Sequence, residues 1–382
     1  SRVLGGALLS TEPKKPKCHS SGNPANVRFM ATSLTLTEHD AQEEFFARGW
    51  TDGLPIVPPT PERVEAMLTF ANVETDDVVG TVPERSRDIT AEKAAINAVM
   101  AGCEPRHFPV VLAALAAMCD PAFGCHTAVT STGGAALCVA ISGPSLEALG
   151  FNASRNALGP GYRANATVGR AMRLVAMNVL GARSNNLDGS SIGHPGKYTM
   201  FVAEETPPEG WDPLRVELGY EATDTTVTVL ATEGPHQVSN QLNGTPEGVL
   251  ATFAAAMTNP ATYGVGKGHQ VLLVLGYEHR TILVESGWTR QAIREHLVEA
   301  SRVTPAYLEA AGIVMEHTTQ NDMTPDADGK LATVRGPDDI LLITAGSPGA
   351  GWSAYIPTWA PTVHSVAATK KVQPAGGGLP SN

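Results

Sequence analysis

The chain has 382 residues, of which 42% are hydrophobic and 17% charged, so it can bury a sizeable core. This composition excludes disorder over the whole chain. The formal net charge of −11 argues against a general nucleic-acid or anionic-membrane binder, because contacts with phosphate groups need a locally basic surface.

Both ends of the chain are predicted to lie outside the fold. Residues 1–34 are expected to be a disordered leader, with Met30 as a candidate natural start, because a short apolar stretch is followed by Pro, Lys, Ser and Gly. Residues 367–382, which contain a Gly-Gly-Gly run, are expected to be a disordered tail. An α/β catalytic domain is predicted between them, over residues 35–366, with a weak possible boundary near 206–213.

The predicted helices and strands alternate along this domain. Apolar residues spaced three and four apart predict helices over residues 61–71, 90–102, 106–119, 162–180, 246–257, 279–286 and 289–300. Short apolar runs predict strands over 127–130, 135–141, 198–203, 225–231, 270–275 and 340–344, the first two joined as a hairpin. This order favours an α/β fold with a layered mixed sheet and flanking helices, as one large core or two closely joined subdomains. No internal repeat is visible in the sequence.

The start of the predicted 162–180 helix is a candidate anion site. A glycine-rich loop leads into this helix, and free backbone N–H groups at a helix start favour an anion. Arg163, Thr167 and Arg170 share one helical face, with Arg173 at its edge, and guanidinium groups suit a carboxylate or phosphate. The alternative is an ordinary solvated face.

The turn of the predicted hairpin is a second candidate. His126 follows a cysteine directly, and strand alternation would point the two side chains to opposite faces, so they are not expected to be a nucleophile and its base. His126 could instead act with Ser131 or Thr132, where Gly133 and Gly134 permit close backbone approach to a ligand. A plain hairpin turn explains the same residues.

Two loops carry histidines that could act as general acids or bases. His194 lies in the polar loop 190–197, together with Lys197 as a possible anion contact, and His236 lies in a loop after the strand that ends near residue 231. Ligands in open α/β sheets usually bind beyond the carboxyl ends of strands, so the two loops support each other. The glycine-rich loop 345–353 is expected to join them. Surface loops are the alternative.

Redox, metal and cofactor signals are weak. Five cysteines without CxxC spacing fit a reducing cytoplasm better than a disulfide framework or a thiolate zinc site. Cys103 lies at a helix end, which lacks the dipole that lowers a thiol pKa at a helix start. Eleven histidines show no metal-binding spacing, and no GxGxxG follows a strand, so no cofactor is predicted. A metal site assembled from ligands on distant loops remains an alternative.

Four segments together resemble a known family: Thr51–Thr60, Ala95–Cys103, Gly161–Thr167 and Gly193–Lys197. They are similar to a bacterial family whose members occur beside, or fused to, a UGSC-type (seleno)protein domain related to the selenoprotein B subunit of glycine/betaine reductase. The resemblance covers most of residues 45–360. This chain lacks a counterpart of the Cys-Gly-Ser-Cys redox motif, so the resemblance implies a redox role only with a partner protein and carries no catalytic residues over.

The leading hypothesis is a soluble cytoplasmic enzyme without a nucleotide cofactor that acts on a small carboxylate- or phosphate-bearing metabolite by hydrolysis or elimination. The residues assigned to it are Arg163 and Arg170 for the anion, Asn165 for orientation, His194 or His236 for proton transfer, and Ser131 or Thr132 as nucleophile or oxyanion donor.

Two other classes of function stay open at this point. One is a thiol-dependent oxidoreductase component that uses Cys103 with a redox partner. The other is a non-catalytic small-molecule binding protein. Neither nucleic acid nor membrane is expected as a partner, and a homo-oligomer is the default expectation for a cytoplasmic enzyme.

Overall fold

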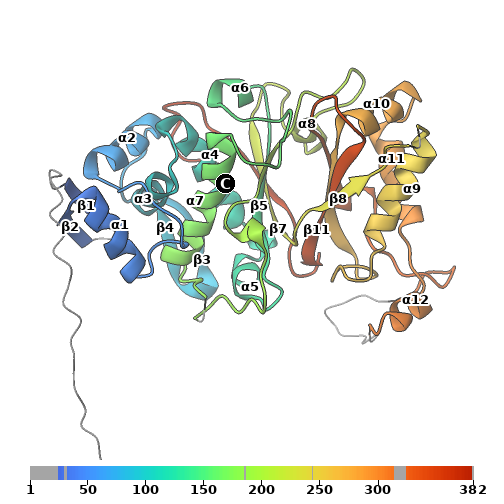
Figure 1. The fold of residues 1–382 in the computed structure, drawn as a ribbon, viewed down its shortest axis with the longest axis horizontal. Helices are drawn as coiled ribbons and strands as arrows, with labels where there is room; N and C mark the ends of the chain where they lie inside the picture. The colour runs from blue at the N-terminus through green and yellow to red at the C-terminus, as the bar shows by residue number, and fades with distance from the viewer. Residues whose placement is uncertain (1–24, 30–31, 185, 243, 314–323, 381–382) are drawn as a thin grey trace, which may run out of the picture.

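The computed structural model describes residues 25–29, 32–184, 186–242, 244–313 and 324–380. Figure 1 shows two layers of strands between two layers of helices. On one outer side lie α2 (Pro61–Ala71), α4 (Phe108–Met118) and α7 (Arg163–Asn178), and on the other lie α9 (Pro246–Met257), α10 (Tyr277–Glu285) and α11 (Arg290–Ala300). Parallel and antiparallel strand pairs occur in the same sheet, and helices cover it on both sides. The predicted α/β fold with a mixed sheet and flanking helices is confirmed.

Within the described residues, eight strands form one sheet in the order β10-β9-β11-β7-β5-β6, with β12 paired to β7 and β8 paired to β11. The pairs β5–β6 and β9–β10 are parallel, and the other pairs are antiparallel. The strands are β5 Ala136–Ser142, β6 Phe201–Ala203, β7 Thr226–Thr232, β8 His236–Ser239, β9 His269–Leu275, β10 Ile340–Thr344, β11 Trp352–Pro361 and β12 Ala368–Lys371. A separate two-stranded sheet pairs β3 Val78–Val82 with β4 Arg87–Thr90.

Most predicted helices are confirmed to within a few residues. Threonines cap several of them: Thr60, for example, accepts a hydrogen bond from the backbone N–H of Arg63, and Pro61 occupies the first helical position. The longer helices are α1 Glu38–Ala47, α2 Pro61–Ala71, α3 Ala91–Ala101, α4 Phe108–Met118, α7 Arg163–Asn178, α9 Pro246–Met257, α10 Tyr277–Glu285 and α11 Arg290–Ala300. The short ones are α5 Cys125–Thr130, α6 Leu146–Leu149, α8 Leu214–Glu217 and α12 Pro305–Ala310.

The two halves of the sheet repeat the same order of elements, although the sequence shows no repeat. With the short helices α5, α8 and α12 set aside, the first half runs α4, β5, α6, α7, β6, β7, β8, and the second runs α9, β9, α10, α11, β10, β11, β12. In each half a parallel pair is followed by an antiparallel third strand. The fourth strand of each half crosses over to pair with the third strand of the other half. The halves also meet where Thr232 pairs with Thr358.

Three apolar clusters fill the spaces between these layers. One packs α2, α3, α4 and α7 on one face of β5 and β7, and a second packs α9, α10 and α11 on β9 and β10. The third lies between the two half-sheets and combines small side chains such as Ala136 and Ala354 with larger ones such as Leu272 and Ile343. Strands covered on both faces read as continuous apolar runs, which is why β5, β9 and β10 were visible in the sequence.

The predicted hairpin over residues 127–141 is wrong in its first strand. Cys125–Thr130 forms the short helix α5, which starts after Gly124 in a left-handed conformation with φ of 64°. A run of six residues cannot distinguish a strand from a single helical turn by periodicity. The sequence also missed β11, because Pro357 and Pro361 argue against a strand.

The two ends are more ordered than predicted. Within the expected leader, Ala25–Phe29 (β1) pairs with Thr32–Leu36 (β2), while residues 1–24 and Met30 lie outside the described residues. In the expected tail, β12 pairs with β7, and Gly376 and Gly378 donate backbone hydrogen bonds to α2. The prediction of a disordered tail is therefore wrong, because β12 covers an edge of β7 that would otherwise be open.

The possible boundary near residues 206–213 falls inside the first half, between β6 and α8. Trp211 in this segment is buried, and its indole N–H donates a 3.0 Å hydrogen bond to the carbonyl of Trp288 in the second half. The segment therefore packs against the other half of the fold.

No single helix among the described residues is long and apolar enough to cross a membrane, although the pair Pro105–Met118 and Pro121–Thr130, bent by 69°, meets the length and composition criteria jointly. The apolar side chains of α4, which belongs to this pair, lie almost entirely in the core of the protein.

Candidate active site

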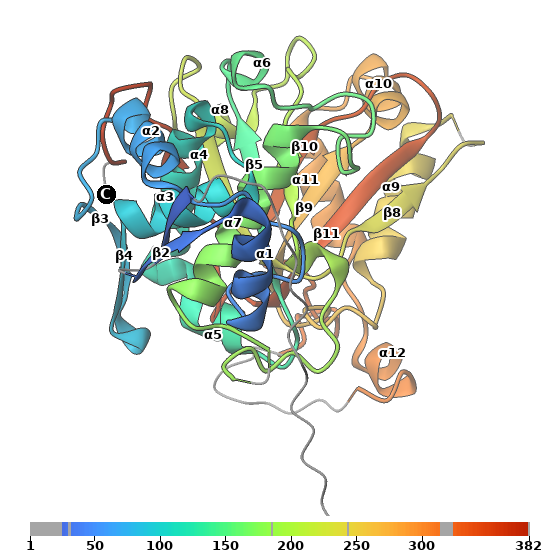
Figure 2. The ribbon, with the colours of Figure 1, turned by 60° about the vertical axis from the view of Figure 1, so that its left-hand side comes forward.

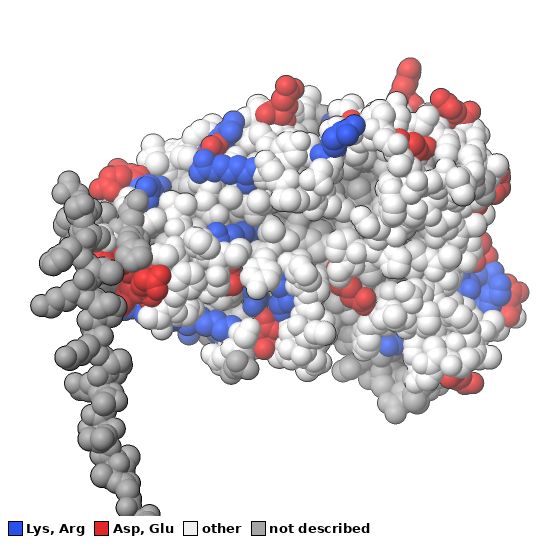
Figure 3. Space-filling model, in the orientation of Figure 1, with Lys and Arg blue, Asp and Glu red and all other residues white. Residues whose placement is uncertain are grey.

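A pocket of about 1090 Å³ lies where the loop 184–198 faces α7 and the segment 49–52. It combines charged, polar and apolar side chains, among them Asp52, Arg173, Met177, Asp188, Ser190 and Lys197. Figure 3 shows basic and acidic side chains in small clusters of both signs on one face of the molecule, separated by uncharged surface. Charge is thus concentrated locally rather than in one large patch of a single sign on that face.

Two polar segments that are separate in the sequence lie side by side at this pocket. The backbone N–H of Gly189 donates to the carbonyl of Thr130 at 3.2 Å, and that of Ser191 donates to the carbonyl of Thr132 at 2.9 Å. Gly134 has φ of +71°, and a Cβ there would lie 3.1 Å from Ser190 Oγ and 3.2 Å from Gly193 N. The turn 131–134 therefore touches the loop that carries Ser190.

Asp188 is the centre of a compact charged cluster in this loop. Its side chain is 3% exposed, and its Oδ2 accepts a hydrogen bond of 2.6 Å from Arg173 and one of 2.8 Å from Lys197. Its Oδ1 accepts from Lys197 at 2.9 Å, from the backbone N–H of Ser190 at 3.1 Å, and from the Ser190 hydroxyl. The Lys197 amine lies 2.5 Å from Ser190 Oγ. One carboxylate thus holds a lysine against a serine.

The environment shifts the pKa values of the two charged partners. Burial is the largest effect on Lys197 and lowers its pKa; Asp188 opposes this, while the nearby Arg173 cation adds to it. Burial alone would raise the pKa of Asp188, but hydrogen bonds from Lys197 and Ser190 and the charge of Arg173 lower it well below its usual range. The carboxylate therefore stays ionised while the amine is biased toward its neutral form.

His194 lines the same pocket, but both of its ring nitrogens have partners. Nε2 lies 3.3 Å from the carbonyl of Thr232, and Nδ1 accepts from the backbone N–H of Gly196 at 3.3 Å. Burial lowers the pKa of His194, so the neutral ring is favoured. Because this neutral ring fixes the start of the turn 195–197, His194 supports the position of Lys197.

The predicted anion-binding face of α7 is engaged within the protein. Arg170 donates two 2.8 Å bonds to Asp52 and contacts the carbonyl of Pro55, and Arg163 pairs with Glu104 and the carbonyl of Gly102. The Thr167 hydroxyl donates to the carbonyl of Arg163. Arg173, at the edge of that face, reaches the pocket.

Three other predicted residues lie away from the Ser190 cluster. Asn165 is buried and exchanges two hydrogen bonds with the backbone of Asn152. His126 lies on α5 with a buried Nδ1 that has no hydrogen-bond partner in the described structure. Cys103 is 5% exposed, and burial raises the pKa of its thiol to about 12. A thiol with that pKa is protonated at neutral pH.

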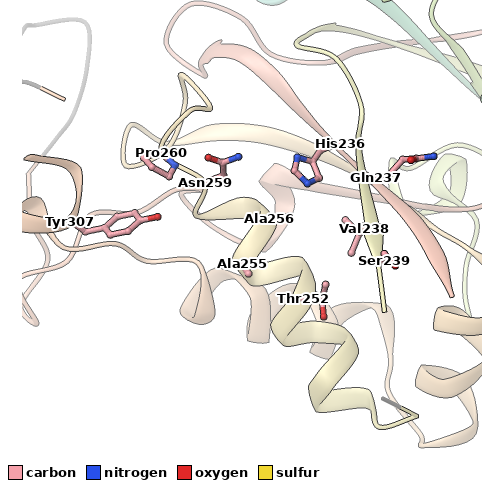
Figure 4. Close-up of a pocket in the computed structure, with 10 residues that line it drawn as sticks. All are labelled: His236, Gln237, Val238, Ser239, Thr252, Ala255, Ala256, Asn259, Pro260 and Tyr307. Carbon is pink, nitrogen blue, oxygen red and sulfur yellow. The ribbon is translucent and has the colours of Figure 1, made fainter. Parts of the chain in front are cut away.

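His236 lines a different pocket, of about 520 Å³, between β8 and α9. Figure 4 shows His236 on the side of β8 that faces Asn259 and Tyr307, with Gln237 on the opposite side. The residues around His236, predicted as a loop, form the strand β8. Side chains alternate between the two faces of a strand, and this directs the His236 ring into the second pocket. The glycine-rich loop 345–353 contributes to a third pocket, with Arg155 and Tyr277. The three predicted loops thus line separate pockets.

Asp188 and Ser190 were absent from the residues assigned by sequence, and Arg173 was named only at the edge of the candidate anion-binding face. Ser190 and Lys197 are seven residues apart in a glycine-rich loop, and no regular periodicity predicts which side chains of such a loop converge. The signal that was available is the Asp-Gly-Ser segment, because a buried aspartate followed by glycine and serine is typical of a tight polar turn.

No group of three or more His, Cys, Asp or Glu side chains in the described part of the chain could hold a metal ion. No protein-family model matches the sequence, and no curated protein matches it either. The resemblance of the four segments to the UGSC-associated family stays an expectation.

Proposed function

We propose that the protein is an enzyme that hydrolyses esters or amides through a covalent acyl intermediate on Ser190. The observation that carries this proposal is the 2.5 Å contact between Lys197 Nζ and Ser190 Oγ beside a large pocket. A serine hydroxyl is a weak nucleophile until an adjacent base takes its proton, and lysine serves as that base in several unrelated hydrolases.

The proton and electron movements follow from the contacts of the cluster. In the structure Lys197 donates to both oxygens of Asp188 and to Ser190 Oγ, and the Ser190 hydroxyl donates to Asp188 Oδ1. When Lys197 loses the proton that faces Ser190, its lone pair takes that place, and the hydroxyl turns from Asp188 to donate to Lys197. As Ser190 Oγ attacks the acyl carbon, its proton passes to Lys197, which then gives it to the departing alkoxide or amine. Water attacks the resulting ester, Lys197 accepts its proton and returns it to Ser190, and the carboxylic acid leaves.

Gly193 is the backbone group that we assign to the oxyanion. Its nitrogen and Ser190 Oγ both lie within 3.2 Å of one point, the position of a Cβ at Gly134. A fixed N–H donor this close to the nucleophile stabilises the negative charge of a tetrahedral intermediate. Glycine at position 134 lets the turn 131–134 pack directly against Ser190 and Gly193.

The proposal keeps the hydrolysis expected from the sequence and changes its residues. Ser190 replaces Ser131 or Thr132 as the nucleophile, and Lys197 takes the proton-transfer role expected of His194 or His236. The high pKa of the buried Cys103 thiol gives no support to a thiol-dependent reaction.

Covalent labelling tests this proposal directly. A fluorophosphonate probe should phosphonylate Ser190 with loss of fluoride, and intact-protein and peptide mass spectrometry would locate the adduct. We expect Ser190→Ala to abolish labelling and Lys197→Met to slow it by roughly 1000-fold, which is typical for loss of a catalytic base. Ser191→Ala is the matched control, since its side chain is exposed in the same loop.

Equal labelling of wild type and Ser190→Ala would overturn the proposal. So would a wild-type protein that is neither labelled nor active on a panel of activated esters and anilides. In both cases the Asp188 cluster would be a loop anchor without catalytic chemistry.

A further inference from the structure

We infer that the Ser190 pocket selects acyl compounds that carry a second, ionised carboxylate, and that Arg173 is the specificity-determining residue that binds it. This inference rests on the proposed function of Ser190. It gives the expected anionic substrate a different cation from those assigned by sequence, because Arg173 lines this pocket whereas Arg163 and Arg170 lie outside its lining.

Arg173 and Ser190 are held at a defined separation by one carboxylate. Arg173 bonds to Oδ2 of Asp188 at 2.6 Å, whereas the Ser190 hydroxyl bonds to Oδ1. Because the two oxygens belong to the same group, Ser190 Oγ and the Arg173 guanidinium lie on the order of 7 Å apart or less. A ligand of a few atoms can therefore contact both.

Arg173 keeps hydrogen-bond donors for an anion. In the part of the chain that the structure describes, the hydrogen bond of Arg173 runs from Nη2 to Asp188, which leaves the Nε and Nη1 edge of the guanidinium for a ligand. A guanidinium carries five N–H donors, so it can bind Asp188 and a substrate carboxylate together. The Arg173 side chain is 13% exposed, and in such poorly solvated surroundings a bidentate guanidinium–carboxylate pair is worth more than in open water.

The separation limits the length of the acyl group. With its carboxylate on Arg173 and its acyl carbon about 3 Å from Ser190 Oγ, the substrate has room for a spacer of no more than roughly two or three methylene groups. Succinyl and glutaryl esters or amides have this length. Met177, Ile192 and Tyr198 add apolar surface to the pocket for the leaving group.

A pair of esters of equal length tests the inference. Hydrolysis of mono-para-nitrophenyl glutarate and of para-nitrophenyl pentanoate would be compared by kcat/KM. We expect wild type to prefer the glutarate ester by roughly 10- to 100-fold, the range of one charged hydrogen-bonded contact. Arg173→Gln should remove this preference while pentanoate hydrolysis persists. Arg163→Gln, on the same helix but outside the pocket, should keep it.

The outcomes separate this inference from the proposed function. Equal use of the two esters by wild type, with both activities lost in Ser190→Ala, would overturn the inference and leave the proposed function standing. Loss of the preference in Arg163→Gln rather than Arg173→Gln would also overturn it. If Arg173→Gln does not fold, competitive inhibition of wild-type pentanoate hydrolysis by glutarate, absent with pentanoate itself, still decides the question.

Discussion

At the scale of single residues, the informative feature is how one buried carboxylate organises its neighbours. Asp188 lies between Arg173, Lys197 and Ser190: its Oδ2 accepts from Arg173, its Oδ1 accepts from Ser190, and both oxygens accept from Lys197. The sequence predicted Lys197 as an anion contact and His194 as a base. In the structure Lys197 contacts a hydroxyl, while both nitrogens of His194 are bonded to the backbone.

The lowered pKa of Lys197 predicts the pH dependence of hydrolysis. Only the neutral amine accepts the Ser190 proton, so kcat/KM should rise with pH as Lys197 loses its proton, through a pKa below the ordinary lysine range. Asp188→Asn removes the charge that stabilises the ammonium form, so its rising limb should move to lower pH. A pH–rate profile of an ester substrate measures both. A limb that moves to higher pH in Asp188→Asn would contradict this account.

At the scale of elements, the site depends on loops that approach each other through glycine. Gly189 packs against the carbonyl of Thr130, where a Cβ would lie 2.8 Å from that oxygen. Gly134 lies against Ser190 and Gly193, with a left-handed φ that only glycine adopts easily. The turn 131–134 was a candidate from sequence for this reason, since glycines permit close approach. Its partner loop could not be identified, because the contact is between distant segments.

Two adjacent glycines give a matched test of this close approach. Gly134→Ala places a Cβ 3.0 Å from Gly193 Cα and forces alanine to φ of +71°, so we expect a loss of about 1–2 kcal/mol in stability and a marked fall in kcat. In Gly133→Ala the new Cβ meets Ser131 Oγ at 3.4 Å and Trp359 at 3.5 Å, which are ordinary contacts. Thermal unfolding and ester hydrolysis of both variants measure the difference. Equal activities would show that position 134 needs no glycine.

At the scale of the whole molecule, the two halves are bound together by exchanged strands and a buried ion pair. After β7 the chain crosses to pair β8 with β11, and after β11 it crosses back to pair β12 with β7. Glu204 at the end of β6 also accepts from Arg290 at the start of α11, with both side chains nearly inaccessible to solvent. Figure 2, turned by 60° from Figure 1, shows β8, β11 and α9 on the side of the molecule opposite α2 and β3. The Ser190 pocket belongs to the first half, and its His194 contacts the carbonyl of Thr232, the residue that pairs with Thr358 of the second half.

Truncation of the chain tests the role of β12. A chain that ends at Val366 loses β12, the buried Ala368 and the Val372 N–H bond to Thr225, so we expect a loss of about 3 kcal/mol or more in the free energy of unfolding. A chain that ends at Gln373 keeps these contacts and should be much closer to wild type. Denaturant unfolding of the two chains makes the comparison. Identical stabilities would restore the expectation of a dispensable tail.

The sequence by itself determined the local structure of this protein. Helices such as α2, α3, α4, α7 and α9, and the buried strands β5, β9 and β10, follow from periodicity, caps and apolar runs, which act over a few neighbouring residues. These elements in turn predict the α/β class.

The tertiary structure alone decided the pairing of the strands, the duplication of the fold and the partners of Ser190. Residues 368–371 form a strand because they pair with the open edge of β7. The helical conformation of α5 likewise depends on its neighbours in the fold rather than on its own periodicity. Likewise, the meeting of Arg173, Asp188, Ser190 and Lys197 depends on how a glycine-rich loop packs on α7 and on the turn 131–134. Contacts between distant segments leave no regular spacing in the chain, and only the folded packing brings them together.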